Sequence, residues 1–397
     1  MPATVVFGAF DRHNLGDLMS AHVAAALLAG EELVFAGLAA RDLRDVGGHR
    51  VEALHALAGD PRLKGARLVH AGGETLTCTA RQAAVMLQAP EQVDDALAFL
   101  ERHPEAEAAW RLAALGTDAQ VPYIGCRAGL PGCSAVVFAG VGGVAFDGLP
   151  AAARSEVVAR LREADAVTVR DAQTQAQLRI AGIAAALVPD PVVLVERLFG
   201  PTIRERVARA PVARVRERFV GGHIAVQLSA DLGDDATLAA LAAQLSRVVA
   251  RTGLGLVLLR AGTAPWHDDA EVLTRLAGQL PIGRTHVFES VHAWDLCAVL
   301  SSARVFVGSS LHGCVIANAF GRPAVGLELT GRSGQGAKLS ANASTWFVED
   351  TAIVRELDDL PASVLDGLAG DPTARTNRAE QRSAAARDLL IPVMRGD

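Results

Sequence analysis

The chain has 397 residues, of which half are apolar and 21% are charged, and its formal net charge is −6. Disordered chains contain far fewer apolar residues, so this composition indicates a folded protein, and the length predicts two domains. The acidic balance, with no basic stripe along the chain, argues against nucleic acid as a partner.

The first ten residues, MPATVVFGAF, have no basic leader and are expected to form a strand, not a signal peptide. No window reaches about 18 uncharged apolar residues, so we expect no transmembrane segment and a cytoplasmic location. The five cysteines are scattered and odd in number, which predicts reduced thiols and neither a disulfide framework nor a metal site: Cys78, Cys126, Cys133, Cys297 and Cys314.

Short runs of Val, Ile, Leu or Phe recur along the chain, end in Gly, Ser, Asp or Pro, and alternate with helical stretches. This pattern is typical of buried parallel strands in a doubly wound sheet. The first half predicts strands at 4–9, 32–38, 67–73, 135–142, 166–171 and 185–191. The second half predicts strands at 224–229, 254–262, 285–290, 304–310, 323–329 and 345–350.

Two sets of about six strands predict an α/β protein with two Rossmann-like domains. We expect an N-terminal domain at 1–203, a basic linker at 204–222, a C-terminal domain at 223–370 and a final helix at 371–397.

About sixty residues separate the Gly72-Gly73-Glu74 turn from the strand at 135, more than a βα crossover needs. They predict a helical insertion at about 77–133, which serves either as a lid or acceptor surface or as a structural appendage. Its helices are expected at 79–89, 91–102 and 104–115.

The first strand leads into a strand-to-helix junction at residues 10–17, FDRHNLGD. Asn14 is a candidate N-cap, Gly16 permits close approach, and Asp17 lies in the first helical turn, where the dipole stabilises a carboxylate. This junction either anchors or deprotonates a sugar hydroxyl, or caps a helix without a ligand. After the strand at 67–73, the paired glycines Gly72 and Gly73 suit a backbone that approaches a ligand.

The run FAGVGGVAF at 138–146 formally fits a dinucleotide fingerprint. However, the helix is expected only near Pro150, and Asp165 precedes the next strand instead of following it. We therefore reject NAD or FAD binding.

Arg170 follows a strand and precedes a helix, so it either grips a phosphate or carboxylate or pairs with neighbouring acids. Asp190 precedes Pro191 in a tight strand end, and we interpret it as structural.

The segment GSSLHG at 308–313 lacks the lysine of a P-loop and is not the GxSxG elbow of hydrolases. His312, at the predicted start of a helix, either donates a proton and holds an anion, or is satisfied inside the packing. Further candidates near this turn are Arg260, His267, Asp268, Arg322 and Lys338.

Taken in order, several motifs resemble those of the polysaccharide pyruvyl transferase family. They are NLGD (14–17), AGGETL (71–76), AGVGG (139–143), TVRDAQTQAQL (168–178), VPDPV (188–192) and SSLHGCVIANAFGRPAVGLEL (309–329). The resemblance implies two Rossmann-like domains facing a cleft, as in B-type glycosyltransferases (the GT-B fold), and agrees with the strand count.

The resemblance further implies transfer of the enolpyruvyl group of phosphoenolpyruvate, a co-substrate, to two hydroxyls of a sugar or glycan, with no other cofactor and no metal. His312 would be the general acid or phosphate anchor, and Asp17 would orient or deprotonate the acceptor. The donor side would comprise Arg170, Ser309, Ser310, Leu311, Gly313, Arg322, Arg260 and Lys338. The acceptor side would comprise Asn14, Gly16, Gly72, Gly73 and Glu74.

One position departs from the family pattern. Many members read Arg-Leu-His-Gly, and here Ser310 stands in place of that arginine. Either Arg322, Arg260 or Lys338 replaces it, or the donor differs.

Two alternatives stay open. The first is a GT-B glycosyltransferase that uses a sugar nucleotide, with Glu328 holding the ribose, and the second is a non-catalytic binding homologue. A homo-oligomer is compatible with either, and the product would be destined for the cell envelope or an exported polysaccharide.

Overall fold

The computed structural model describes residues 3–330 and 337–396. Residues 1 and 2 of the expected first domain, 331–336 of the expected second domain and 397 of the expected final helix lie outside the described residues. The chain forms two compact units: unit 1 consists of Met1–Pro191 and Ala385–Asp397, and unit 2 consists of Val192–Ala384.

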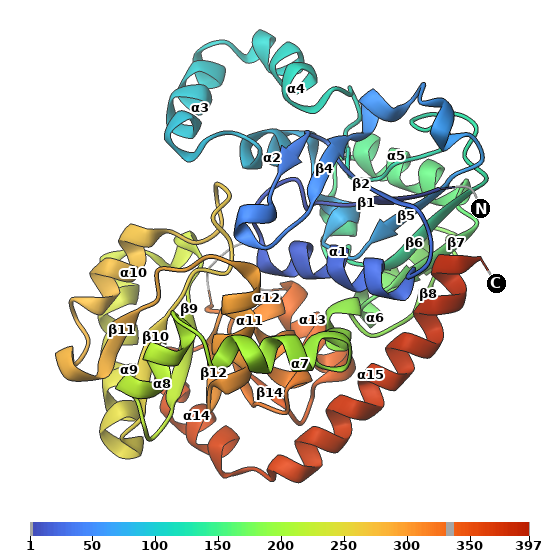
Figure 1. Ribbon diagram of the computed structural model, residues 1–397. Helices are drawn as coiled ribbons and strands as arrows, with labels where there is room; N and C mark the ends of the chain where they lie inside the picture. The colour runs from blue at the N-terminus through green and yellow to red at the C-terminus, as the bar shows by residue number, and fades with distance from the viewer. Residues whose placement is uncertain (1–2, 331–336, 397) are drawn as a thin grey trace. The chain divides into compact units, whose positions relative to one another are not determined.

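Unit 1 is built on an eight-stranded sheet in the order β3-β4-β2-β1-β5-β6-β7-β8 (Figure 1). All neighbouring pairs are parallel except β3 and β4. The strands are β1 (Thr4–Phe7), β2 (Leu33–Gly37), β3 (Arg41–Asp42), β4 (Arg50–Ala53), β5 (Arg67–Ala71), β6 (Ala135–Val141), β7 (Ala166–Val169) and β8 (Ala186–Leu187). The sequence pattern missed the short strands β3 and β4.

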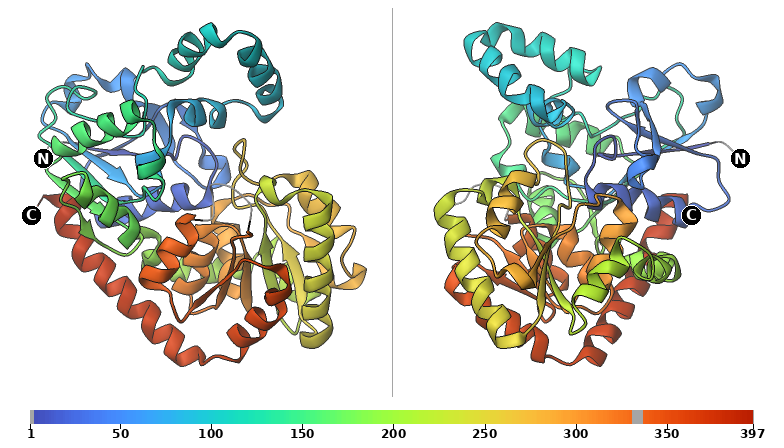
Figure 2. Two further views of the ribbon diagram at one scale, coloured as in Figure 1. Left: turned by 180° about the vertical axis from the view of Figure 1, so that it is seen from behind. Right: turned by 60° about the vertical axis from the view of Figure 1, so that its left-hand side comes forward.

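Unit 1 contains α1 (Leu15–Leu27), α2 (Ala80–Met86), α3 (Val93–Arg102), α4 (Glu107–Leu115), α5 (Ala151–Arg162) and α6 (Ala172–Ile180). Its main core joins alternate strand residues such as Phe7, Leu68 and Phe138 to Val157 and Leu161 of α5. The three helices expected in the insertion are confirmed as α2, α3 and α4, and α3 and α4 extend away from the sheet of unit 1 in every view (Figure 2).

Unit 2 has a six-stranded parallel sheet in the order β11-β10-β9-β12-β13-β14. The strands are β9 (His223–Gln227), β10 (Gly255–Leu258), β11 (Thr285–Val287), β12 (Val305–Gly308), β13 (Ala324–Leu327) and β14 (Thr351–Val354). The two sheets confirm the expected α/β class with predominantly parallel strands.

The helices of unit 2 are α7 (Val195–Val207), α8 (Val212–Arg218), α9 (Asp235–Thr252), α10 (Ala270–Ala277), α11 (Ala293–Ser302), α12 (Leu311–Ala319), α13 (Ala337–Trp346) and α14 (Leu360–Ala369). The last helix, α15 (Pro372–Arg395), begins in unit 2 and ends in unit 1. Alternate strand residues such as Ile224, Val226 and Val305 form one core with α9, α10 and α14.

The expected linker at 204–222 is mostly helical. Residues 204–207 end α7 and residues 212–218 form α8, and the compact units meet in sequence earlier, at Pro191 and Val192. Arg206 forms an ion pair with the nearly buried Asp295 of α11, while Ile203 and Val215 are fully buried. The arginines that gave this segment a linker-like composition therefore belong to helices packed within unit 2.

The expected strand at 345–350 was wrong. Trp346 ends α13, residues 347–350 form a turn, and β14 begins at Thr351. Asp350 is buried in this turn, where it forms ion pairs with Arg378 and Arg382 of α15. An apolar run this short has no periodicity by which to separate a strand from a helix end.

The expected C-terminal helix is confirmed as α15, which binds to both units. Within unit 1, the Arg395 guanidinium donates to the Leu27 carbonyl, and Arg67 donates to the Met394 carbonyl. Across residues 3–330 and 337–396, no helix combines the length and the apolar character that crossing a membrane requires.

Candidate active site

Each unit has one point at which its strand order reverses direction. In unit 1, β2 and β5 lie on opposite sides of β1, and in unit 2, β10 and β12 lie on opposite sides of β9. In open α/β sheets, ligands bind at the carboxyl ends of the strands beside such a point. The expected site residues divide between these two places, with Asn14, Asp17 and Gly72 in unit 1 and Ser310 and His312 in unit 2.

The N-terminus of α1 follows β1 at the switch point of unit 1. Asn14 is its N-cap, as predicted, because its Oδ1 accepts hydrogen bonds from the Gly16 and Asp17 backbone N–H groups at 3.1 and 3.3 Å. Asp17 is nearly buried in the first turn, and its Oδ1 lies beside Gly73 in the loop that follows β5. These expected acceptor-side residues therefore lie together at one edge of the sheet.

Arg12, to which the sequence pattern assigned no role, lies beside the Asp17 carboxylate. Its Nη2 is 3.9 Å from Asp17 Oδ2, and its Nη1 donates to the Tyr123 hydroxyl, which donates in turn to Asp11 Oδ1 at 2.8 Å. Burial raises the pKa of Asp11, although Arg12 opposes that rise. The Arg12 Nε is buried and has no hydrogen-bond partner among the described residues.

Arg170 is held between two carboxylates within unit 1. The residue is only 1% exposed, and its guanidinium lies 2.6 Å from Glu74 Oε2 and 3.1 Å from Asp190 Oδ2. Burial favours a lower pKa for Arg170, but the two carboxylates outweigh burial and raise it. The expected pairing with acids is therefore present, and Asp190 has the structural position predicted for it.

Glycines let the loops after β5 and β6 approach this ion pair. Gly72 and Gly73 have φ values of +60° and +80°, a backbone conformation that residues with a Cβ rarely adopt. A Cβ on Gly142 would lie 2.3 Å from Glu74 Oε2 and 2.7 Å from Arg170 Nε. Glu74 also accepts a hydrogen bond from Val144 N–H at 2.8 Å, so it connects the loop after β5 to the loop after β6.

At the switch point of unit 2, Gln227 at the end of β9 connects two neighbouring loops. Its Oε1 accepts a hydrogen bond from Ser310 N–H at 2.8 Å, and its Nε2 donates to Asp268 Oδ1 at 2.7 Å. Ser309 Oγ accepts from Ser229 N–H at 3.0 Å. The amide of Gln227 thus fixes the turn before α12 against the loop that follows β10.

Ser310, at the position of the family's arginine, is the N-cap of α12. Its Oγ accepts a hydrogen bond from Gly313 N–H at 3.1 Å. Leu311 and His312 are buried in the first turn, where the helix dipole favours an anion. A Cβ on Gly313 would lie 2.3 Å from Phe306 Cζ, so this glycine lets α12 pack on β12.

Asp268 is a titratable group beside this turn. Its Oδ2 accepts hydrogen bonds from Ala261 and Gly262 N–H at 2.6 and 3.3 Å. Burial raises the pKa of Asp268 to about 7, against the lowering effects of these hydrogen bonds, of Gln227 and of the Arg260 charge. Arg260, an expected donor-side residue, is therefore part of the electrostatic surroundings of this cluster.

We expect unit 2 to lose stability as pH rises from about 4 to about 7. In that range the unfolded chain has ionised Asp268, whereas the folded protein retains its proton. The stabilisation from this group is complete below the pKa of the unfolded chain. Above that pKa, the free energy of unfolding falls by up to about 1.4 kcal/mol per pH unit. Asp268→Asn should flatten this slope in urea unfolding followed by tryptophan fluorescence, because three of the four tryptophans belong to unit 2: Trp266, Trp294 and Trp346.

The matched control is Asp366→Asn, which changes an exposed carboxylate of α14 and should keep the wild-type slope. An unchanged pH dependence in Asp268→Asn would contradict the assigned titration.

Arg322 lies apart from the start of α12. Arg322 lies beyond the end of α12 and just before β13, so it is at the amino edge of the sheet, about 14 Å of helix away from His312. This position does not suit the expected role of replacing the arginine at 310. Lys338 lies in the first turn of α13. Glu328, at the end of β13, accepts a hydrogen bond from Ser340 Oγ at 2.5 Å.

Three residues beside these turns were not assigned a role from the sequence: Arg12, Tyr123 and Gln227. Only the position of Arg12 beside NLGD could have indicated it, because the contacts of Tyr123 and Gln227 are distant in sequence. Trp266 was also missed. It is 44% exposed with a φ of 64°, a backbone strain that is typical of functional loops.

No group of three or more His, Cys, Asp or Glu side chains that could hold a metal ion occurs within residues 3–330 and 337–396. All five cysteines are free thiols, and four of them are buried.

Several solved structures share this fold. A UDP-GlcNAc 2-epimerase from Neisseria meningitidis superposes with a TM-score of 0.55 at 9% identity, covering all of both chains. The enzyme of the same name from Methanocaldococcus jannaschii gives 0.58 at 9% identity, over 98% of this chain and 99% of that one. Trehalose 6-phosphate synthase from Burkholderia multivorans gives 0.53 at 14% identity, over 100% and 97%. At these identities the likeness shows the fold alone, and it confirms the expected GT-B-like class.

No curated protein matches the sequence. A family model does match, and the matched segment contains the AGVGG, TVRD, VPDPV and SSLHG motifs but not the NLGD junction or the AGGETL turn. Residues 139–330, just under half of the chain, match the model of the polysaccharide pyruvyl transferase family, which confirms the family resemblance expected from the motifs.

Proposed function

We propose that this protein transfers the enolpyruvyl group of phosphoenolpyruvate to two hydroxyls of a sugar or glycan and forms a cyclic ketal. The observation that carries the proposal is the family match over 139–330, which includes both the TVRD and the SSLHG motifs. Phosphoenolpyruvate carries a carboxylate and a phosphate, and such groups bind arginines and helix N-termini. The switch point of unit 2 supports that chemistry, because it has the capped start of α12 and the charge of Arg260, which acts on Asp268.

The proposed reaction has two steps. A proton is added to the methylene carbon of the donor, and a sugar hydroxyl bonds to the adjacent carbon as that hydroxyl loses its proton. A second hydroxyl then displaces inorganic phosphate, so one donor and one diol give one ketal and one phosphate. His312 serves as the proton donor or phosphate anchor, and Asp17 orients or deprotonates the acceptor.

Ser310 changes how the donor would be held. Its hydroxyl caps α12, so the N-terminal N–H groups of that helix stay fixed, while the arginine found in many family members is missing. We assign the replacement charge to Arg260, since Arg322 is at the other edge of the sheet. The donor role of Arg170 would require the donor to compete with Glu74 and Asp190.

The acceptor is proposed to be a sugar or glycan, with a product destined for an exported polysaccharide or the cell envelope and with the enzyme acting in the cytoplasm, alone or as a homo-oligomer. Phosphorus NMR of the protein with phosphoenolpyruvate and a panel of sugars tests the reaction. Inorganic phosphate should appear only when a suitable acceptor is present.

A sugar-nucleotide glycosyltransferase is the second candidate. It is favoured by Glu328, which follows the carboxyl end of β13, and by the likeness in fold to a UDP-GlcNAc 2-epimerase that was solved with UDP-GlcNAc bound. Release of UDP from a UDP-sugar, with phosphoenolpyruvate left intact, would support this candidate and contradict the first.

A further inference from the structure

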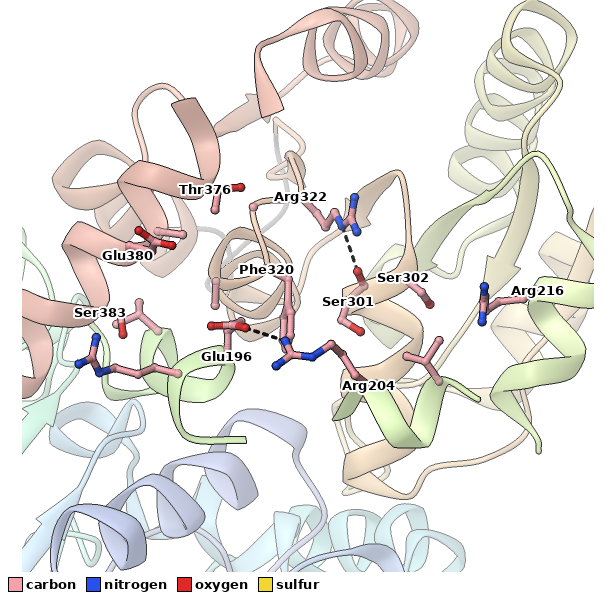
Figure 3. Close-up of a pocket in the computed structure, with 16 residues that line it drawn as sticks. Glu196, Arg204, Arg216, Ser301, Ser302, Phe320, Arg322, Thr376, Glu380 and Ser383 are labelled. Carbon is pink, nitrogen blue, oxygen red and sulfur yellow. Dashed lines mark hydrogen bonds and ion pairs between the residues drawn. The ribbon is translucent and has the colours of Figure 1, made fainter. Parts of the chain in front are cut away.

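Unit 2 contains a cavity of about 740 Å³ at the amino edge of its sheet (Figure 3). It is lined by Ser301 and Ser302 at the end of α11, by the turn from Ala319 to Arg322 after α12, and by residues of α7, α8 and α15. This volume is typical of sites for small molecules. The cavity lies at the opposite end of α12 from His312, so it is separate from the candidate active site.

The lining of this cavity is basic although the whole chain is acidic. Four arginines and two glutamates give it a net charge of +2, whereas the chain has −6: Arg197, Arg204, Arg216, Arg322, Glu196 and Glu380. Only one of these arginines forms an ion pair with a described residue, because Arg204 lies 2.9 Å from Glu196 Oε1. Figure 3 shows this pair on α7 at the centre of the lining.

The other three arginines keep donors available. Arg322 donates its Nε to the Ser301 carbonyl at 3.0 Å, and its two terminal nitrogens make no hydrogen bond or ion pair within the described chain. Arg197 and Arg216 are exposed and form no ion pair with residues of the described ranges. Burial, together with the charges of Arg304 and Arg375, lowers the pKa of Arg322, so positive charge here is not compensated.

A buried hydroxyl supplies independent support. Ser383 of α15 lines the cavity and is only 6% exposed, yet its Oγ has no hydrogen-bond partner among the described residues. Leaving a buried hydroxyl without a partner is unfavourable, and a hydrogen bond with a ligand oxygen would remove that cost. The hydroxyls of Ser301 and Ser302 on α11 are already bonded to backbone carbonyls.

We propose that this cavity is a second binding site, for a small molecule that carries a diphosphate or two adjacent phosphate groups. Arginine guanidinium groups from α8 and from the turn after α12 would bind the anionic oxygens, as such groups do in phosphate sites. Ser383 lies on the other side of Phe320 from Arg216 and Arg322 (Figure 3), so it would bind an oxygen of the part of the ligand that extends beyond its phosphates. Phe320 gives the lining between them an apolar surface.

Inorganic pyrophosphate is the probe, and isothermal titration calorimetry of the full chain is the measurement. We expect saturable binding to the wild type, with affinity reduced at least about tenfold in Arg216→Gln and in Arg322→Gln. Arg214→Gln is the matched control, because Arg214 is an exposed arginine of the same helix that does not line the cavity, and it should bind as the wild type does.

His312→Ala separates this site from the candidate active site and should retain pyrophosphate binding. Absence of binding to the wild type would overturn the proposal. So would equal affinities of Arg214→Gln and Arg216→Gln, or a loss of binding in His312→Ala alone. Because Arg216 is exposed, its replacement by glutamine should leave folding unaffected.

Discussion

His312→Ala should lower the rate of phosphate release from phosphoenolpyruvate by at least about hundredfold, the usual contribution of a positioned acid or base. The change should leave unfolding by urea nearly unaltered, because alanine suits the first turn of α12 and Ser310 still caps it. Turnover of both proteins, measured with the same acceptor, gives the comparison.

His312→Gln separates the two roles of this residue. Glutamine can donate a hydrogen bond to a phosphate but cannot supply a proton to carbon, so an inactive glutamine variant indicates the acid role and partial activity indicates the anchor role. His286→Ala is the control, since His286 lies on the edge strand β11, and it should keep activity within about twofold. Unchanged turnover in His312→Ala would remove this residue from the mechanism.

Arg170→Met should destabilise the protein by about 3–5 kcal/mol, because it leaves the Glu74 and Asp190 carboxylates without their shared cation. Asp190 is buried and cannot be stabilised by water instead. Urea unfolding followed by circular dichroism measures the loss. Arg179→Met, at an exposed position of the neighbouring helix α6, should cost no more than about 0.5 kcal/mol.

A double variant tests the pairing itself. Adding Asp190→Asn to Arg170→Met removes one uncompensated charge and should recover part of the lost stability. If the double variant loses the sum of the two single effects, the ion pair is not what holds these loops together.

The strands and the helix starts were largely predictable, because they depend on neighbours in the sequence. Apolar runs predicted eleven of the twelve expected strands within a few residues of their observed positions, and Asn14 was identified as an N-cap from its side chain alone. The strand expected at 345–350 was wrong because that prediction, too, used only neighbours in the sequence. A run of three apolar residues fits a helix end as well as a strand, and the ion pairs of Asp350 with α15 are too distant in sequence to be predicted.

The basic composition of residues 204–222 predicted a linker there, whereas the two units meet in sequence at Pro191 and Val192. Arginine-rich segments are typical of exposed linkers, but here Arg206 pairs with Asp295 of α11, and Val212 and Val215 between the arginines are fully buried. The helical spacing of Ile203, Val207, Val212 and Val215 could have indicated the buried face.

The site was predictable only as separate turns. The sequence placed His312 at a helix start, but the link from Ser310 through Gln227 to Asp268 depends on β9 lying between β10 and β12. Strand order of this kind follows from packing and not from any local pattern. By contrast, the position of Arg322 at the opposite edge of the sheet from Ser310 follows from the order strand, helix, strand, which the sequence did predict.

The central claim is that a ketal forms from phosphoenolpyruvate, and carbon NMR with phosphoenolpyruvate labelled at its second carbon tests it most directly. With a sugar acceptor, the signal of the labelled enol carbon should be replaced by that of a ketal carbon, with one inorganic phosphate released per ketal. Labelled pyruvate as the only product, or transfer from a UDP-sugar while the labelled enol signal persists across the acceptor panel, would contradict the account.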